Sequence, residues 1–129
     1  ELESGNIVFC DRYVDSTTAY QGYARGLGAE EVERLNALAV GDVKIDLTIF
    51  LDFPPEKAFA RKGGRDTGDR LENEKMEFHK RVYEGFCKIA EKEPCRVVRL
   101  DASGSKEQTH EKIVKLLIER GIIPSENNA

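Results

Sequence analysis

Three residues with complementary chemistry follow an apolar run near the start of the chain. Asp11, Arg12 and Tyr13 come directly after residues 7–10, and such an abrupt change is typical of a buried parallel strand that ends at a ligand crevice. The planar guanidinium of Arg12 can bind two phosphate oxygens at once, which a lysine cannot do. Asp11 can orient Arg12 or hold a magnesium ion through water. For the tripeptide alone, a salt bridge beside a packing tyrosine is the favoured interpretation.

Hydroxyls, a second tyrosine and an amide come next, at Ser16, Thr17, Tyr20 and Gln21. Tyr20 and Gln21 follow Thr17 at the spacing that brings side chains to one helix face. Gln21 can donate and accept hydrogen bonds along a base edge, and Tyr20 can abut a sugar. A solvated helix face is the alternative. Together with residues 11–13, the set favours a site for a phosphorylated small molecule.

Arginines alternate with glycines over residues 61–70, where Arg61, Arg65 and Arg70 carry the charge. Glycine makes a backbone mobile, and arginine supplies positive charge to a phosphoryl group in transfer. A mobile, arginine-bearing loop between two helices suits a closing lid, which we expect at about residues 61–72. A solvated basic turn fits the segment equally well.

Small residues follow the last apolar run, at Asp101, Ala102, Ser103 and Gly104. They would let a flat base approach the backbone, although a plain turn between strand and helix explains them too. The chain has no Gly-x-x-x-x-Gly-Lys-Ser/Thr phosphate-binding loop.

Three short apolar runs are predicted to be buried strands, and an aspartate directly follows or ends each. The runs are residues 7–10, 47–51 and 96–100, and the aspartates are Asp11, Asp52 and Asp101. Because each run ends at an aspartate, we predict parallel strands whose carboxyl ends lie on one edge of a sheet. If upstream strands are absent, the sheet is left with an edge of unpaired backbone groups, which favours aggregation.

Helices are predicted between these strands from apolar periodicity and capping residues. The first is capped by Asp15 or Ser16 and runs to about Arg25, and the second covers residues 29–40, with an apolar stripe at Val32, Leu35, Leu38 and Ala39 and a stop at Gly41. A short helix over 54–60 is followed by a longer one, which is capped by Asn73 and buries Phe78, Val82, Phe86 and Ile89. The last has a capping box from Ser105 to Gln108, buries Ile113, Leu116 and Leu117, and ends at Gly121. This order predicts a single α/β domain with a parallel sheet flanked by helices.

Composition excludes several classes of protein. The 129 residues carry a net charge of −4, which argues against a nucleic-acid binder, and no apolar run could cross a membrane. The first residues lack the pattern of a signal peptide, and the chain does not begin with methionine, so we expect that the true N-terminus lies elsewhere. Three cysteines form no disulfide framework, which favours the cytoplasm. Cys10 and Cys87 are expected in the core, and His79 and His110 lack metal-ligand spacing.

Several linked motifs together resemble the bacterial thymidylate kinase family. The similarity covers residues 11–22, Leu35-Asn36, residues 46–52, Pro55-Glu56, residues 69–72, Phe78 and Asp101-Ala102, and it extends from about residue 7 to 117. The resemblance implies an incomplete three-layer fold of the P-loop kinase type, without the first strand and the P-loop. It also implies transfer of the γ-phosphoryl group of ATP to thymidine monophosphate, with Mg²⁺, in a cytoplasmic homodimer.

The resemblance also assigns roles to single residues. Arg12 would hold the acceptor phosphate, Thr17 and Gln21 would face thymine, and Tyr20 would crowd the sugar's 2′ position. Tyr13 and Ser16 belong to the same substrate-binding set, and Asp11 would act near magnesium.

On the ATP side, Arg65 would be the lid arginine that reaches the transferred group, supported by Arg61 and Arg70. The stretch Asp101, Ala102 and Ser103 would border adenine. Because the phosphate loop is missing, the 129 residues alone are expected to be nearly inactive. A kinase for another nucleoside monophosphate and a non-catalytic nucleotide-binding module are the alternatives.

Overall fold

The computed structural model describes residues 1–61 and 70–125 of the chain. Its elements in chain order are α1 (Val14–Thr17), the π-helix η1 (Thr18–Ala24), α2 (Ala29–Val40), β1 (Thr48–Asp52), α3 (Pro55–Arg61), α4 (Arg70–Lys92), β2 (Val97–Asp101) and α5 (Lys106–Glu119). Among the described residues, no helix is long and apolar enough to cross a membrane.

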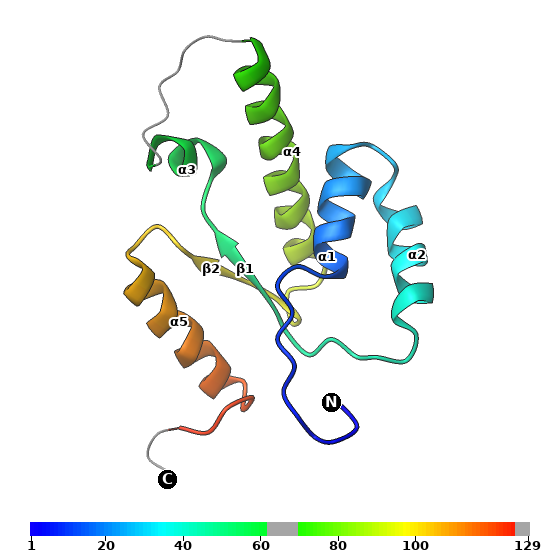
Figure 1. Cartoon of the computed structure of the whole chain (residues 1–129), viewed down its shortest axis with the longest axis vertical. Coiled ribbons are helices and arrows are strands. Elements are labelled where there is room, and N and C mark those ends of the chain that lie inside the picture. Colours follow the sequence, from blue (N-terminus) through cyan, green and yellow to red (C-terminus); the bar gives the residue numbers. More distant parts are fainter. Residues whose placement is uncertain (62–69, 126–129) are drawn as a thin grey trace.

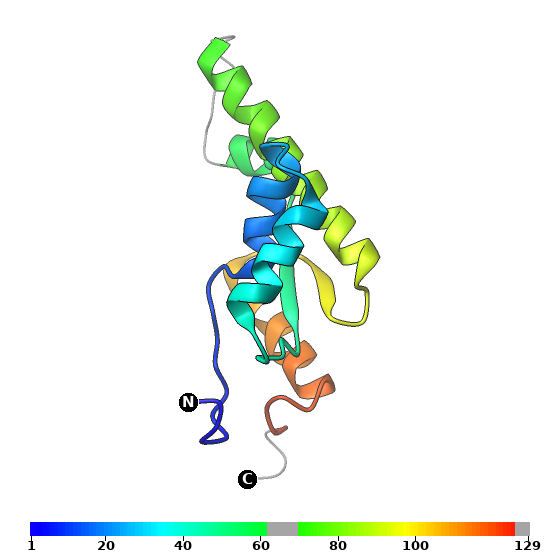
Figure 2. The same ribbon diagram turned by 90° about the vertical axis from the view of Figure 1, so that its right-hand side faces the viewer.

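Two parallel strands form the sheet, with Thr48 opposite Val97 and Asp52 opposite Asp101. The parallel pairing and the shared carboxyl edge predicted for these two aspartates are therefore confirmed. Figure 1 shows α5 on one side of the strand pair, with η1, α2 and the end of α4 on the other. Figure 2 shows the same arrangement from the side, with the N-terminal segment running up to α1.

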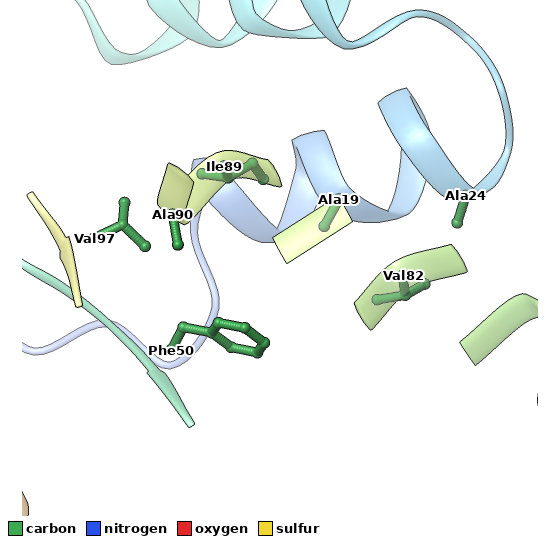
Figure 3. Packing of buried hydrophobic residues seen from close by; sticks show 7 residues of the cluster. All are labelled: Ala19, Ala24, Phe50, Val82, Ile89, Ala90 and Val97. Atoms are coloured by element: carbon green, nitrogen blue, oxygen red, sulfur yellow. The ribbon is translucent and has the colours of Figure 1, made fainter. Parts of the chain in front are cut away.

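The core lies where η1 and α4 cross the sheet. Phe50 and Val97 point from the strands towards helix residues in Figure 3, where the full cluster is Ala19, Ala24, Phe50, Val82, Ile89, Ala90 and Val97. Phe50 also stacks on Phe86, with ring centroids 5.1 Å apart. The apolar face predicted for α4 is thus confirmed, because Phe78 and Phe86 pack against this cluster as well.

The buried strand predicted over residues 7–10 is wrong. These residues form no regular element and pair with no described strand, and Ile7, Val8 and Phe9 are 53%, 53% and 70% exposed. A strand is stable only beside a neighbour that pairs with its backbone, and the described sheet contains β1 and β2 alone. The expected third strand is therefore absent from the described sheet, and Cys10 is exposed rather than part of the core.

The first helix differs from the expected one in its hydrogen bonds. The amide of Arg25 donates to the carbonyl of Tyr20 over 3.1 Å, as in the wide turn of a π-helix. The helix starts after Tyr13, which makes no side-chain cap, so the caps predicted at Asp15 and Ser16 are wrong. Asp15 instead lies in the first turn and is buried.

Two later helices form where they were predicted but differ in detail. Helix α2 has the predicted bounds and ends at Gly41, whose φ of 62° is in the left-handed region that favours glycine. Of its apolar stripe only Val32 is buried, while Leu35 and Leu38 are 65% and 82% exposed. In α4 the predicted cap at Asn73 is wrong, because the helix already begins at Arg70.

The capping box of α5 is confirmed: Ser105 Oγ accepts from the amide of Gln108, and the Gln108 side chain accepts from the amide of Ser105. Leu117 is buried, as predicted. Ile113 and Leu116 are only half-buried. Of the described elements, α5 makes its main contacts with β2, so part of its apolar face lies uncovered.

Candidate functional site

Arg12 lies directly before Tyr13, the N-cap residue of α1, in an unusual backbone conformation. Its φ of 64° makes it the only non-glycine residue with a positive φ among those described. This conformation costs roughly 1–2 kcal/mol for a residue with a Cβ, and such strain concentrates at functional sites. The Cys10 thiol donates to the Arg12 carbonyl over 3.4 Å, a local contact that accompanies the turn.

The Arg12 side chain folds back onto Tyr20. Arg12 Nη2 donates to the Tyr20 hydroxyl over 3.3 Å, and the guanidinium carbon lies 5.2 Å from the centre of the ring. A cation above a ring face is electrostatically attracted. The structure therefore brings together two predicted site residues that are eight positions apart, and the exposed Arg12 remains open to an anion.

Phe78 supports Tyr20 from α4, with an edge contact at 6.0 Å between ring centroids. The guanidinium carbons of Arg25 and Arg81 lie 6.0 and 5.9 Å from the Phe78 ring centre, and Arg81 Nε donates to the Ala24 carbonyl over 3.1 Å. Sequence reasoning missed both arginines. The spacing from Phe78 to Arg81, which is helical, is a signal that could have found Arg81.

The remaining predicted substrate residues are spread along the same segment. Thr17 is exposed at the end of α1, whereas Ser16 and Gln21 are half-buried and Tyr13 is 46% exposed. Gln21 lies in the wide turn of η1, where a residue four positions after Thr17 still falls near the same side of the helix, so the shared face of Thr17 and Gln21 stays a prediction.

Asp11, the predicted magnesium residue, is an exposed carboxylate. Over residues 1–61 and 70–125, no group of three or more His, Cys, Asp or Glu side chains could hold a metal ion. Magnesium at nucleotide sites usually takes one or two carboxylates, with water and phosphate oxygens as the other ligands. An exposed carboxylate one residue before Arg12, the predicted phosphate ligand, is compatible with that manner of binding.

Arg61 joins the end of α3 to the loop after β2. Its guanidinium donates to the carbonyls of Ser103 and Gly104, the latter over 3.2 Å, and lies 4.5 Å above the centre of the Phe53 ring. Arg65, the predicted lid arginine, falls outside the described residues. Arg70 is the first residue of α4, and most of the predicted lid likewise falls outside the described part.

The loop after β2 borders a groove of about 460 Å³ on the N-terminal part of α5. Lys112 Nζ donates over 2.8 Å to both the carbonyl and Oδ2 of Asp101, and the Ser103 amide donates to Oδ1 over 3.0 Å. The hydrogen bond from Lys112, followed by those from Ser103, lowers the pKa of Asp101 far below its usual range. Ala102 is half-buried, and its amide donates to the Asp52 carbonyl.

A pair of parallel strands flanked by helices is consistent with part of a P-loop kinase fold, and the comparisons bear out this class. The chain is similar over 90% of its length to thymidylate kinase from Ehrlichia chaffeensis, whose crystal structure it matches with a TM-score of 0.67 at 34% identity, over 51% of that chain.

The chain belongs to the thymidylate kinase family, since the model of that family matches residues 1–113. A thymidylate kinase from Synechococcus sp. (strain JA-2-3B'a(2-13)) is 53% identical over 81% of this chain and 49% of its own length. One from Trichormus variabilis is 44% identical over 91% of this chain and 56% of its own length. The chain thus spans about half the length of these relatives.

Proposed function

We propose that the protein carrying this chain transfers the γ-phosphoryl group of ATP to thymidine monophosphate, giving the diphosphate. Membership of the family supports this function. The observation that carries it is the Arg12 guanidinium, held against Tyr20 and open to solvent where an anionic acceptor can bind.

The acceptor would bind along the segment from Tyr13 to Gln21. Arg12 binds its phosphate through paired hydrogen bonds, which suit a planar guanidinium. Thr17 and Gln21 face the thymine, and Tyr20 lies against the sugar and disfavours a 2′-hydroxyl. Tyr13 and Ser16 complete the pocket wall.

The donor would lie towards the opposite loops. Asp101, Ala102 and Ser103 border the adenine, and the contact of Arg61 with Ser103 links that border to the start of the lid. Arg65 approaches the transferred group, and Arg70 supports it. Magnesium, when bound near Asp11, would supply positive charge for the phosphate oxygens.

Catalysis on this scheme needs positioning and charge more than proton transfer. The acceptor phosphate is already anionic, so no general base has to activate it. The arginines orient the two phosphates and stabilise the charge that develops between them.

Two further features belong to the proposal. A homodimer is favoured by the exposed Leu35 and Leu38 on α2, since large exposed apolar patches mark interfaces. A cytoplasmic protein is favoured by the cysteines, since Cys10, Cys87 and Cys95 are all free.

The proposal is tested by expressing the complete reading frame that contains this chain and measuring ADP formation. Turnover with thymidine monophosphate should exceed turnover with the uridine and guanosine monophosphates. Faster turnover of another monophosphate would identify a different nucleotide kinase. Nucleotide binding without turnover would identify a binding module.

A further inference from the structure

Three side chains from distant parts of the sequence form a closed ring at the start of α1. Arg96 Nη1 and Nη2 donate to the two carboxylate oxygens of Asp15, both over 2.8 Å. The Thr48 hydroxyl donates to Asp15 Oδ2 over 2.7 Å and accepts from Arg96 Nη1 over 2.9 Å. Every member of the ring therefore contacts the other two.

This ring is well shielded from water. The side chains of Asp15 and Arg96 are 12% and 20% exposed, and the Arg96 Nε is bound by Glu93 over 2.6 Å. Burial by itself raises the pKa of Asp15, but the hydrogen bonds from Arg96 and Thr48 and the charge of Arg96 outweigh it, so the pKa is lowered. The Arg96–Asp15 ion pair is stronger than an ordinary surface ion pair, because it has two short hydrogen bonds and is largely shielded from water.

The ring fixes the first turn of α1 to the sheet. Asp15 is in that turn, Thr48 begins β1, and Arg96 directly precedes β2. The amides of Ser16 and Thr17 donate to the Tyr13 carbonyl, so the turn is continuous with the residue after Arg12.

Of the described contacts, the stretch before Arg12 contributes a local one, from the Cys10 thiol to the Arg12 carbonyl. Residues 7–11 are exposed and pair with no described strand. Two polar contacts hold the α1 side: the Asn36 side chain donates to the Val14 carbonyl over 3.1 Å, and the ring joins the first turn to the sheet.

We infer that Asp15, Thr48 and Arg96 are positioning residues, which hold Arg12 against Tyr20 in the orientation that receives an anionic phosphate. None of the three touches the ligand. They act by keeping the first turn of α1 in place, so that the guanidinium does not have to be ordered when the phosphate binds. The phosphate part of the inference rests on the proposed function, whereas the orientation of Arg12 can be measured without it.

The first measurement is the nuclear Overhauser contact between the Arg12 side chain and the Tyr20 ring in the 129-residue chain. Arg96→Met keeps much of the side-chain volume and removes the fork, and the contact should be lost. Arg99→Met is the matched control, because Arg99 also pairs with a carboxylate, through Nε and Nη2 to Oδ2 of Asp52, but from the middle of β2. The control should retain the contact.

Retention of the contact in a folded Arg96→Met chain would overturn the inference. If that variant does not fold, Thr48→Val decides instead, because it removes only the hydroxyl from the ring. A Thr48→Val chain with an unchanged contact would overturn the inference as well. Arg96→Lys, which restores charge but not the fork, should restore the contact only in part.

The second measurement is calorimetric binding of thymidine monophosphate and of thymidine. Arg96→Met should reduce the preference for the phosphorylated ligand roughly tenfold, in line with loss of one charge-assisted contact, and leave thymidine affinity unchanged. In an Arg12→Ala background the same substitution should change nothing. An equal loss for both ligands would show general loosening and overturn the inference. An unmodified chain that binds both ligands equally would overturn the proposed function, while the Overhauser contact still decides the positioning role.

Discussion

The Tyr83 hydroxyl donates a hydrogen bond to Oδ1 of Asp52 over 2.8 Å, which ties the middle of α4 to the carboxyl end of β1. Arg99 Nε donates to the other carboxylate oxygen over 2.9 Å. Asp52 thus joins a helix and the neighbouring strand through one carboxylate. Neither contact was predicted, because the three residues are far apart in the sequence.

This contact predicts an unusual tyrosine titration. The hydrogen bond to Asp52, together with burial, raises the pKa of Tyr83 to about 12. An ultraviolet titration should therefore show one tyrosine that ionises about two pH units later than usual, and Tyr83→Phe should remove that component. A titration curve unchanged by the substitution would contradict the assignment.

The same shift predicts how stability falls in alkali. Because the folded pKa of Tyr83 exceeds the unfolded value of 10.0, its contribution is complete below pH 10 and is lost as the pH rises towards about 12. In denaturant melts, Tyr83→Phe should flatten the decline in stability over this window. An equally steep decline in the variant would show that another group causes it.

Arg12→Ala should weaken binding of thymidine monophosphate by about 1.5–3 kcal/mol, or roughly tenfold to a hundredfold, because a charge-assisted contact is lost. Thymidine affinity should hardly change. Arg12→Lys is the matched control, since it keeps the charge without the planar guanidinium. Its affinity for thymidine monophosphate should lie between those of the unmodified chain and Arg12→Ala. Calorimetry that shows full affinity in the alanine variant would place the phosphate elsewhere.

Arg65→Ala should lower turnover of the complete protein roughly a hundredfold or more, with little change in thymidylate affinity, since its partner charge develops during transfer. Steady-state kinetics with ATP and thymidine monophosphate measure both quantities. Lys62→Ala, in the same segment, is the control for charge alone. Unchanged turnover would remove Arg65 from the catalytic residues.

Gly22→Ala should destabilise the fold by about 1–3 kcal/mol, as overpacking does. A Cβ at Gly22 would lie 2.9 Å from the Cα of Ala29, so the backbone of α2 would have to move. Glu84→Ala, at an exposed helical position, is the control for helix propensity. Chemical denaturation measures both, and a Gly22→Ala chain at least as stable as the original would show that α2 adjusts freely.

Ser105→Ala should cost about 1 kcal/mol, the usual loss when a helix cap is removed. Amide hydrogen exchange should accelerate in the first turn of α5, above all at Gln108, whose amide loses its acceptor. Ser105→Asp keeps an accepting oxygen and should retain protection. Uniform protection in all three chains would mean that packing on β2 alone holds this helix end.

Local sequence patterns by themselves determined β1, β2, α2 and the capped start of α5. In each case the signal lies within a few neighbouring residues: an apolar run that ends in aspartate, a period of three to four, Gly41 at a helix end, or Ser105 three positions before Gln108. The linked motifs from Asp11 to Gly22 also identified the family, because they lie close together and in order.

Only the tertiary structure decided the burial and the hydrogen bonds of residues whose partners are distant in the sequence. Asp15 looked like a cap, but Arg96, 81 positions away, draws it into a buried pair. The apolar residues 7–10 looked like a strand, but they are exposed and no described strand pairs with them. Local propensity describes what a segment prefers, whereas burial and ion pairing depend on what the rest of the chain places beside it.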